Sequence, residues 1–288
     1  MDGKKSFFDL LDARSALLVG ATGGLLALGT VGFIVLGAFS IKNPAVFASS
    51  GQLVAQTTPQ GNQAPTQAQA QIPPPPVVPK SDRPKIELFV MSYCPYGLQM
   101  EKAYAPAWDL LKNKADIDVK FVSYAMHGLK EVEENTRQYC IEKNQNNKYI
   151  AYLQCFTASG DATSCLASVG ISANALQSCI NDTNAQFGIM AKYNNQSTWL
   201  SGQYPLYPIH DALNQKYGVQ GSPTLVINGV QANVGRTPEA VKQAICAAFN
   251  NPPSECGQAL SAVAFVPGFG ASQQTGGAAP AGGAGCGT

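Results

Sequence analysis

The stretch "KIELFVMSYCPYGLQME" (85–101) decides the fold. Its first part, "KIELFVM" (85–91), is an apolar run of strand length. Residues 97–113 repeat apolar side chains at helical spacing. Cys94 therefore lies between the end of a strand and the start of a helix. Gly97 stands where a C-x-x-C motif would have its second cysteine, so the question is whether Cys94 is a reactive thiol.

The segments that follow complete an α/β pattern. "IDVKFVSY" (117–124) alternates apolar and polar residues at first, so strand, helix and strand predict a βαβ unit with a parallel pair. "SPTLVINGVQANV" (222–234) contains two strands joined by Asn228-Gly229, a strong hairpin signal. "TPEAVKQAICAAF" (237–249) predicts a helix with Thr237 as its N-cap.

The region between these two units is helical. Residues 129–200 show no strand alternation, and a short helix over 209–219 ends at Gly218. We therefore predict an α/β domain over residues 84–256. Its order is βαβ, a helical insert over about 128–205, a short helix, and ββα.

Both ends of the chain differ from this domain in composition. Residues 16–39 are apolar or small throughout, which is enough to cross a bilayer as a helix after a short cytoplasmic N-terminus (1–15). A cleaved signal peptide is the alternative. Residues 40–83 predict a Pro/Gln/Ala-rich linker, and the Gly/Ala-rich residues 257–288 predict a disordered tail. We expect a single-pass membrane protein with its C-terminal domain on the extracytoplasmic side.

Charge and cysteine content restrict the function. A net charge of +1 argues against a nucleic-acid partner, which requires a basic face. Metal-ligand spacings such as C-x2-C are absent from the sequence and there are only two histidines, so we predict neither a metal site nor a cofactor. Eight cysteines on the extracytoplasmic side predict disulfides instead.

Six cysteines form three structural pairs in the simplest arrangement. Cys246 and Cys256 close a short loop with two prolines, which favours their pairing. The helical insert allows three connectivities, and a helical hairpin favours Cys155 with Cys165 and Cys140 with Cys179.

Cys94 is the candidate nucleophile. At a helix start its sulfur faces unpaired N–H groups and the positive end of the helix dipole, which favour the reactive thiolate. Pro95 suits the first helical turn, and Tyr96 is placed to line the approach to the sulfur. In this layout the Ser222-Pro223 loop lies beside the same helix start, so these four residues form the candidate substrate site. In the alternative, Cys94 is a buried apolar residue or half of a structural disulfide.

Cys286 is the remaining cysteine. A monothiol site stops at the mixed disulfide unless another thiol attacks it. Cys286 lies on a tail long enough to reach across the domain, so it could resolve Cys94 or link two chains. An incidental exposed thiol is the third possibility.

The C-P-Y sequence at Cys94, the Ser222-Pro223 pair and the order of elements resemble the thioredoxin superfamily, in particular its DsbA-type branch with a helical insert. Gly97 departs from the C-P-Y-C pattern. "HGLKEVEENTRQYC" (127–140) is similar to the signature of gamma-interferon-inducible lysosomal thiol reductases, but Ala125 and Val132 replace its first two cysteines. Both resemblances imply a thiol oxidoreductase.

The prediction is a membrane-anchored, extracytoplasmic thiol–disulfide oxidoreductase with a monothiol site, reductase-like or isomerase-like, acting on protein disulfides. Its expected partners are cysteine-containing proteins or peptides and a small thiol or redox protein. One alternative is a redox-inactive domain that binds peptides. Another is an envelope protein crosslinked through Cys286.

Overall fold

The computed structural model describes residues 77–275 and 284–287. The predicted N-terminus (1–15), the predicted membrane helix (16–39) and most of the predicted linker lie outside the described residues. Within the described part of the chain, no helix has both the length and the apolar character needed to cross a membrane.

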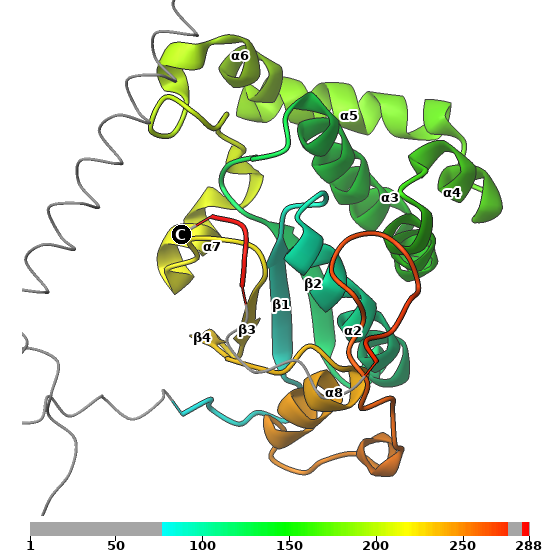
Figure 1. The fold of residues 1–288 in the computed structure, drawn as a ribbon. Coiled ribbons are helices and arrows are strands. Elements are labelled where there is room, and N and C mark those ends of the chain that lie inside the picture. The colour runs from blue at the N-terminus through cyan, green and yellow to red at the C-terminus, as the bar shows by residue number, and fades with distance from the viewer. Residues whose placement is uncertain (1–76, 276–283, 288) are drawn as a thin grey trace, which may run out of the picture. The chain divides into compact units, whose positions relative to one another are not determined.

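Four strands form a mixed sheet in the order β2-β1-β3-β4 (Figure 1). The strands are β1 (Lys85–Val90), β2 (Asp116–Phe121), β3 (Thr224–Ile227) and β4 (Val230–Gln231). β1 pairs with β2 in parallel and with β3 in antiparallel orientation. All of β1 after its first residue is buried, as its apolar run requires of a central strand.

Helix α2 (Pro95–Leu111) connects the two parallel strands, and α8 (Pro238–Ala247) packs against it. The Thr237 hydroxyl accepts the N–H of Ala240, so the predicted N-cap of α8 is confirmed. Asn228 and Gly229, both at positive φ, form the turn of the β3–β4 hairpin. This sheet order and its crossovers are those of the thioredoxin-like fold.

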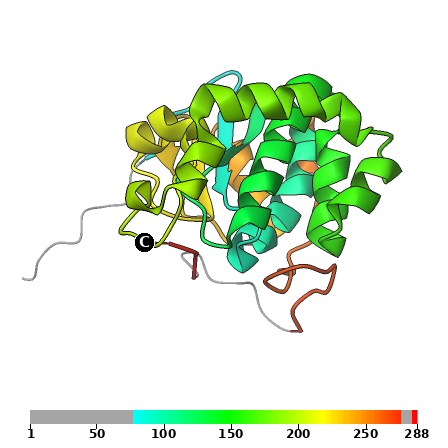
Figure 2. The same cartoon turned by 90° about the horizontal axis from the view of Figure 1, so that it is seen from above.

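The insert is helical, as predicted. It consists of α3 (Leu129–Ser159), α4 (Ala162–Ser168), α5 (Ala173–Phe187) and α6 (Ile189–Asn194). Figures 1 and 2 show these green helices as one group, in which α5 runs across α3. A 3-10 turn (Gln196–Thr198) follows them, and η4 (Pro208–His210) leads into α7 (Asp211–Tyr217), which returns the chain to β3.

The predicted domain boundaries are too narrow at both ends. On the N-terminal side, Ser81 donates its N–H to the carbonyl of Ala248, so part of the expected linker packs on the domain. On the C-terminal side, residues 257–275 form a folded loop rather than a disordered tail. The ammonium group of Lys102 in α2 donates to the carbonyls of Val266, Gly268 and Gly270 at 2.7–2.8 Å. The loop is thus held through its own backbone carbonyls, and its Gly/Ala-rich composition gives no sign of this packing.

Candidate active site

Cys94 is the N-cap residue of α2, as predicted. Its backbone is extended (φ −67°, ψ 121°), and Pro95 occupies the first helical position. The Sγ atom accepts the N–H of Gly97 at 3.4 Å, which satisfies one of the unpaired donors of the helix start. The side chain of Cys94 is fully buried.

Cys94 is bonded to Cys286, with Cα atoms 6.0 Å apart and a sequence separation of 192 residues. The prediction of a monothiol site is therefore wrong for this state of the protein. The second sulfur comes from the C-terminal segment 284–287, drawn in red in Figure 1, and not from position 97. Local sequence could not reveal this because the partner is so distant along the chain.

Ser222 holds the C-terminal segment in an extended conformation. The N–H of Ser222 donates to the carbonyl of Cys286 at 2.9 Å, and the N–H of Cys286 donates to the carbonyl of Ser222 at 2.7 Å. Ser222 and Cys286 therefore form an antiparallel bridge. The Ser222-Pro223 peptide bond is cis, and the carbonyl oxygen of Ser222 lies 3.4 Å from Sγ of Cys94. The structure thus brings the predicted Ser222-Pro223 loop to Cys94.

Gly97 is required by the close approach of Ser222. A Cβ atom at position 97 would lie 2.6 Å from Oγ of Ser222 and 3.3 Å from Cβ of Cys94. This hydroxyl is fixed because it accepts the N–H of Met91 at 3.0 Å. Any side chain at position 97, including that of a second cysteine, would need Ser222 to move.

Two residues of α3 hold the backbone that precedes Cys94. Asn135 Oδ1 accepts the N–H of Ser92 at 3.1 Å, and Glu131 Oε2 accepts the N–H of Tyr93 at 3.0 Å. Both side chains are fully buried. The other partner of Glu131 Oε2 is the ring nitrogen Nδ1 of His127, at 2.6 Å. Sequence reasoning aligned these residues with a signature but missed that they position the Cys94 loop.

The electrostatic environment of α2 favours a negative charge at its start. The first turn contains no acidic residue. Glu101, the nearest acidic residue further along the helix, is fully buried, and desolvation raises the pKa of its carboxyl well above the ordinary value. Within α2 itself, the positive end of the helix dipole therefore acts on Cys94, while the carboxyl group of Glu131 from α3 lies beside the same loop and accepts the N–H of Tyr93.

Arg236 ties the C-terminal segment to α2. Its guanidinium donates to the carbonyl of Ala284 at 2.6 Å and to Oε1 of Gln99 at 3.1 Å. It also lies over the ring of Tyr96, 5.5 Å from the ring centroid. Tyr96 and Cys286 both pack against the apolar cluster that contains Cys94. Arg236 was not predicted from the sequence.

Two hollows border the C-terminal segment. One, of about 420 Å³, includes Tyr124, Met126 and Tyr204 together with Gly285 and Gly287. The other, of about 230 Å³, includes Ser222 and Pro223 with the same two glycines. Gly285 and Gly287 thus line both depressions.

The remaining cysteines form the three pairs that sequence reasoning favoured: Cys140–Cys179, Cys155–Cys165 and Cys246–Cys256. The first joins α3 to α5, the second joins α3 to α4, and the third closes the loop after α8. All eight cysteines lie in the described part of the chain, and none of them is free.

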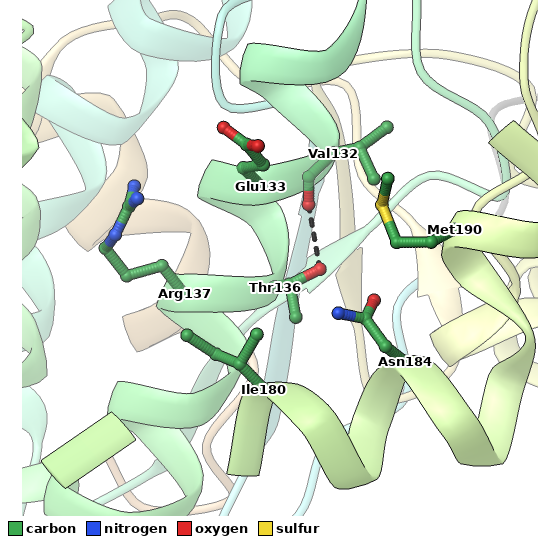
Figure 3. A pocket seen from close by; sticks show the side chains of 7 residues that line it. All are labelled: Val132, Glu133, Thr136, Arg137, Ile180, Asn184 and Met190. Carbon is green, nitrogen blue, oxygen red and sulfur yellow. Dashed lines mark hydrogen bonds between the residues drawn. The ribbon is translucent and has the colours of Figure 1, made fainter. Parts of the chain in front are cut away.

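A further pocket of about 290 Å³ lies on the helical insert (Figure 3). Its lining comes from α3, α5 and α6, where Thr136 donates its hydroxyl hydrogen to the carbonyl of Val132 at 2.8 Å. Arg137 at its edge pairs with the buried Glu134. The pocket is lined by no cysteine, so it offers no thiol chemistry.

No family model matches the chain, and no curated protein matches it. Among solved structures, the chain is similar to the reduced disulfide oxidoreductase DsbG of Mycobacterium tuberculosis, with a TM-score of 0.42 and 14% identity over 62% of this chain and 89% of that one. It is also similar to reduced DsbA of the same organism, with a TM-score of 0.42 and 14% identity over 62% of this chain and 94% of that one. A third similar structure is MdbA of Corynebacterium diphtheriae, a thiol-disulfide oxidoreductase, with a TM-score of 0.38 and 17% identity over 57% of this chain and 84% of that one. The structural neighbours are thus thiol–disulfide oxidoreductases of the DsbA and DsbG type, while the fold assignment rests on the sheet topology itself.

Proposed function

We propose that this protein is a thiol–disulfide oxidoreductase whose redox pair is Cys94 and Cys286. One observation carries the proposal: the cysteine at the N-cap of α2 is bonded to a cysteine whose backbone pairs with Ser222. Cys286 thus occupies the position that a cysteine in an extended substrate strand would take, with main-chain hydrogen bonds for affinity.

The reduced protein would act on a protein disulfide in two steps. The thiolate of Cys94 attacks one substrate sulfur, forms a mixed disulfide and expels the other substrate sulfur as a thiolate. The thiolate of Cys286 then attacks Cys94 Sγ, forms the Cys94–Cys286 bond and expels the first substrate sulfur. The substrate gains two electrons and the protein loses two, so an external thiol must reduce the pair again.

This cycle revises the monothiol scheme predicted from the sequence. Cys286 provides the second sulfur, so a single chain can complete the reduction of a substrate disulfide. The proposed partners are cysteine-containing proteins or peptides and a small thiol or redox protein that resets the pair. We also propose that residues 16–39 anchor the chain in a membrane with residues 77–288 on the extracytoplasmic side, where disulfides persist.

The test is reduction of a protein disulfide, such as those of insulin, by the full chain with dithiothreitol as the electron donor. We expect Cys94→Ser to abolish the activity. Cys286→Ser should instead accumulate a mixed disulfide between Cys94 and the substrate, visible on non-reducing gels. The matched control is the double variant Cys246→Ser/Cys256→Ser, which removes a crosslink at the end of α8 and should keep the activity. Full activity in Cys94→Ser would refute the proposal.

A second candidate is a redox-inactive domain in which the Cys94–Cys286 bond is a permanent crosslink. The complete burial of Cys94 favours it. The two candidates differ in how fast dithiothreitol opens this bond. If dithiothreitol reduces Cys94–Cys286 no faster than it reduces Cys246–Cys256, the permanent crosslink is supported. If it reduces Cys94–Cys286 faster, the enzyme is supported. The bond within one chain gives no support to crosslinking between chains.

A further inference from the structure

The two sulfurs of the Cys94–Cys286 bond differ in access. Cys94 is fully buried in a cluster with Phe89, Met91 and Val226. Cys286 is partly exposed, and its neighbouring glycines line both hollows beside the segment. A thiolate attacks a disulfide sulfur from the side opposite the bond that breaks, so it needs open space at the attacked atom. Access therefore favours Cys286.

The two sulfurs also differ as leaving groups. If Cys286 is attacked, Cys94 leaves as a thiolate at the start of a 17-residue helix, where its Sγ already accepts the N–H of Gly97. If Cys94 is attacked, Cys286 leaves on an extended segment without such a helix start. The more stabilised thiolate leaves faster, so this effect also favours attack on Cys286.

Hydrogen bonds to the domain hold residues 284–287 besides the S–S bond. The described residues 284–287 keep the two hydrogen bonds between Ser222 and Cys286 and the one from Arg236 to Ala284. Ala284 and Gly285 are exposed. Cys286 and Gly287 are half-buried, so we expect the S–S bond to be the main restraint on this short segment and the segment to open once that bond breaks.

We propose, resting on the function proposed above, that the resetting thiol attacks Sγ of Cys286 and not Sγ of Cys94. An external thiolate forms a bond to Cys286 Sγ, the Cys94–Cys286 bond breaks, and its electron pair stays on Cys94 as the thiolate. Segment 284–287 moves away with the incoming group attached and uncovers Cys94. A second thiol then attacks the incoming group's sulfur and releases Cys286 as a thiolate. Two external thiols are oxidised to one disulfide, and the protein pair is reduced.

The test maps the first adduct. The oxidised full chain is mixed with 2-mercaptoethanol and excess iodoacetamide, quenched in acid and analysed by peptide mass spectrometry. We expect mercaptoethanol on Cys286 together with carbamidomethyl on Cys94. This combination should exceed the reverse one by about tenfold, because the thiolate at the helix start is the better leaving group. Equal amounts, or an excess of the reverse combination, would overturn the proposal.

A second measurement separates this proposal from the function on which it rests. In Cys286→Ser, Cys94 is free, and its alkylation and its exchange with insulin are followed directly. If Cys94 exchanges in this variant but the wild-type adduct lies on Cys94, only the order of attack is wrong. If Cys94 does not exchange, or if the Cys94–Cys286 bond stays closed while Cys246–Cys256 opens, both proposals fail.

Discussion

Ser222 and Cys286 exchange two backbone hydrogen bonds, so the C-terminal segment adds one strand-like residue beside the loop that faces Cys94. The sulfur and the backbone of Cys286 are thus fixed by neighbouring parts of one site. Any change that prevents this backbone pairing should weaken the disulfide, although it leaves both cysteines in the chain.

Gly287→Ala tests this coupling. Gly287 has φ +77°, and a Cβ atom there would overlap the hydroxyl of Tyr124, which is held by its hydrogen bond to the carbonyl of Gln220. The left-handed conformation alone disfavours alanine by about 1–2 kcal/mol. We expect the equilibrium constant for closing Cys94–Cys286 in a glutathione buffer to fall about tenfold or more. Gly257→Ala, at an open position, is the control, and an unchanged constant in Gly287→Ala would contradict the coupling.

A double-mutant cycle tests the contact between positions 97 and 222. Gly97→Ala should lower the free energy of unfolding by about 1–3 kcal/mol because its Cβ meets Oγ of Ser222. Ser222→Ala removes this hydroxyl but leaves the N–H of Met91 without its acceptor. In the double variant the overlap is gone, so its loss in the free energy of unfolding should be about 1 kcal/mol smaller than the sum of the two single losses. Additive effects in urea unfolding would argue against the steric reason for glycine.

Glu131→Gln tests the support of the Cys94 loop. The carboxylate accepts the N–H groups of Met126, His127 and Tyr93, and an amide offers one oxygen in place of two. We expect a loss of about 1–3 kcal/mol in the free energy of unfolding, and a changed rate of Cys94 alkylation in the Cys286→Ser background. The exposed neighbour Glu133→Gln should change neither quantity. If Glu131→Gln keeps the wild-type free energy of unfolding and the same rate of Cys94 alkylation, the loop does not depend on this carboxylate.

Lys102→Met tests the folded loop after α8. The ammonium group binds three carbonyls of residues 266–270, and its loss leaves these acceptors to water. We expect the free energy of unfolding to fall by about 1.5–3 kcal/mol and the loop to become sensitive to limited proteolysis. Lys112→Met, which removes a pair with the exposed Asp109, is the control. Unchanged protease resistance at 257–275 would contradict the role of Lys102.

His210 predicts a loss of stability in acid. Burial, assisted by Lys120, lowers its pKa from 6.5 to about 3, and its Nδ1 accepts the N–H of Phe121. Below pH 6.5 the unfolded chain binds a proton that the folded chain does not, so stability falls between pH 6.5 and 3. The expected slope is about 1.4 kcal/mol per pH unit at most.

The variant His210→Asn keeps an acceptor for Phe121 and should lack this slope in urea unfolding at a series of pH values. Burial raises the pKa of Glu142 to about 7, which has the opposite effect between pH 4.5 and 7. That contribution is the same in both proteins and cancels in their difference. Equal slopes in the wild type and the variant would assign the acid sensitivity to other groups.

The parts of the fold that depend on short-range patterns could be predicted from sequence. The strand before Cys94, the N-cap position of its sulfur, the Asn228-Gly229 turn and the Thr237 cap each follow from a few adjacent residues. The helical insert follows because residues 129–200 lack the alternation of apolar and polar residues that is typical of strands. These features depend on backbone conformation and burial, which leave a local record in the sequence.

The parts of the site that depend on distant contacts could not be predicted. Cys286 had three open roles, because the composition of a Gly/Ala-rich tail does not say where its backbone will pair. The loop of residues 257–275 packs through its carbonyls, which every sequence has. Glu131 and Asn135 bind backbone N–H groups of the Cys94 loop, and their sequence gives only a weak hint, since acidic and amide side chains at a helix start are common at surfaces.

The four disulfides are nested along the chain. The Cys94–Cys286 ring encloses the other three, and Cys155–Cys165 lies inside Cys140–Cys179. Opening the outermost ring leaves every inner ring closed, so the unfolded form of the reduced protein still has restricted conformational entropy. In the redox cycle proposed above, the chain would therefore lose its longest covalent constraint in each turnover without giving up the shorter ones that hold the helical insert and the end of α8.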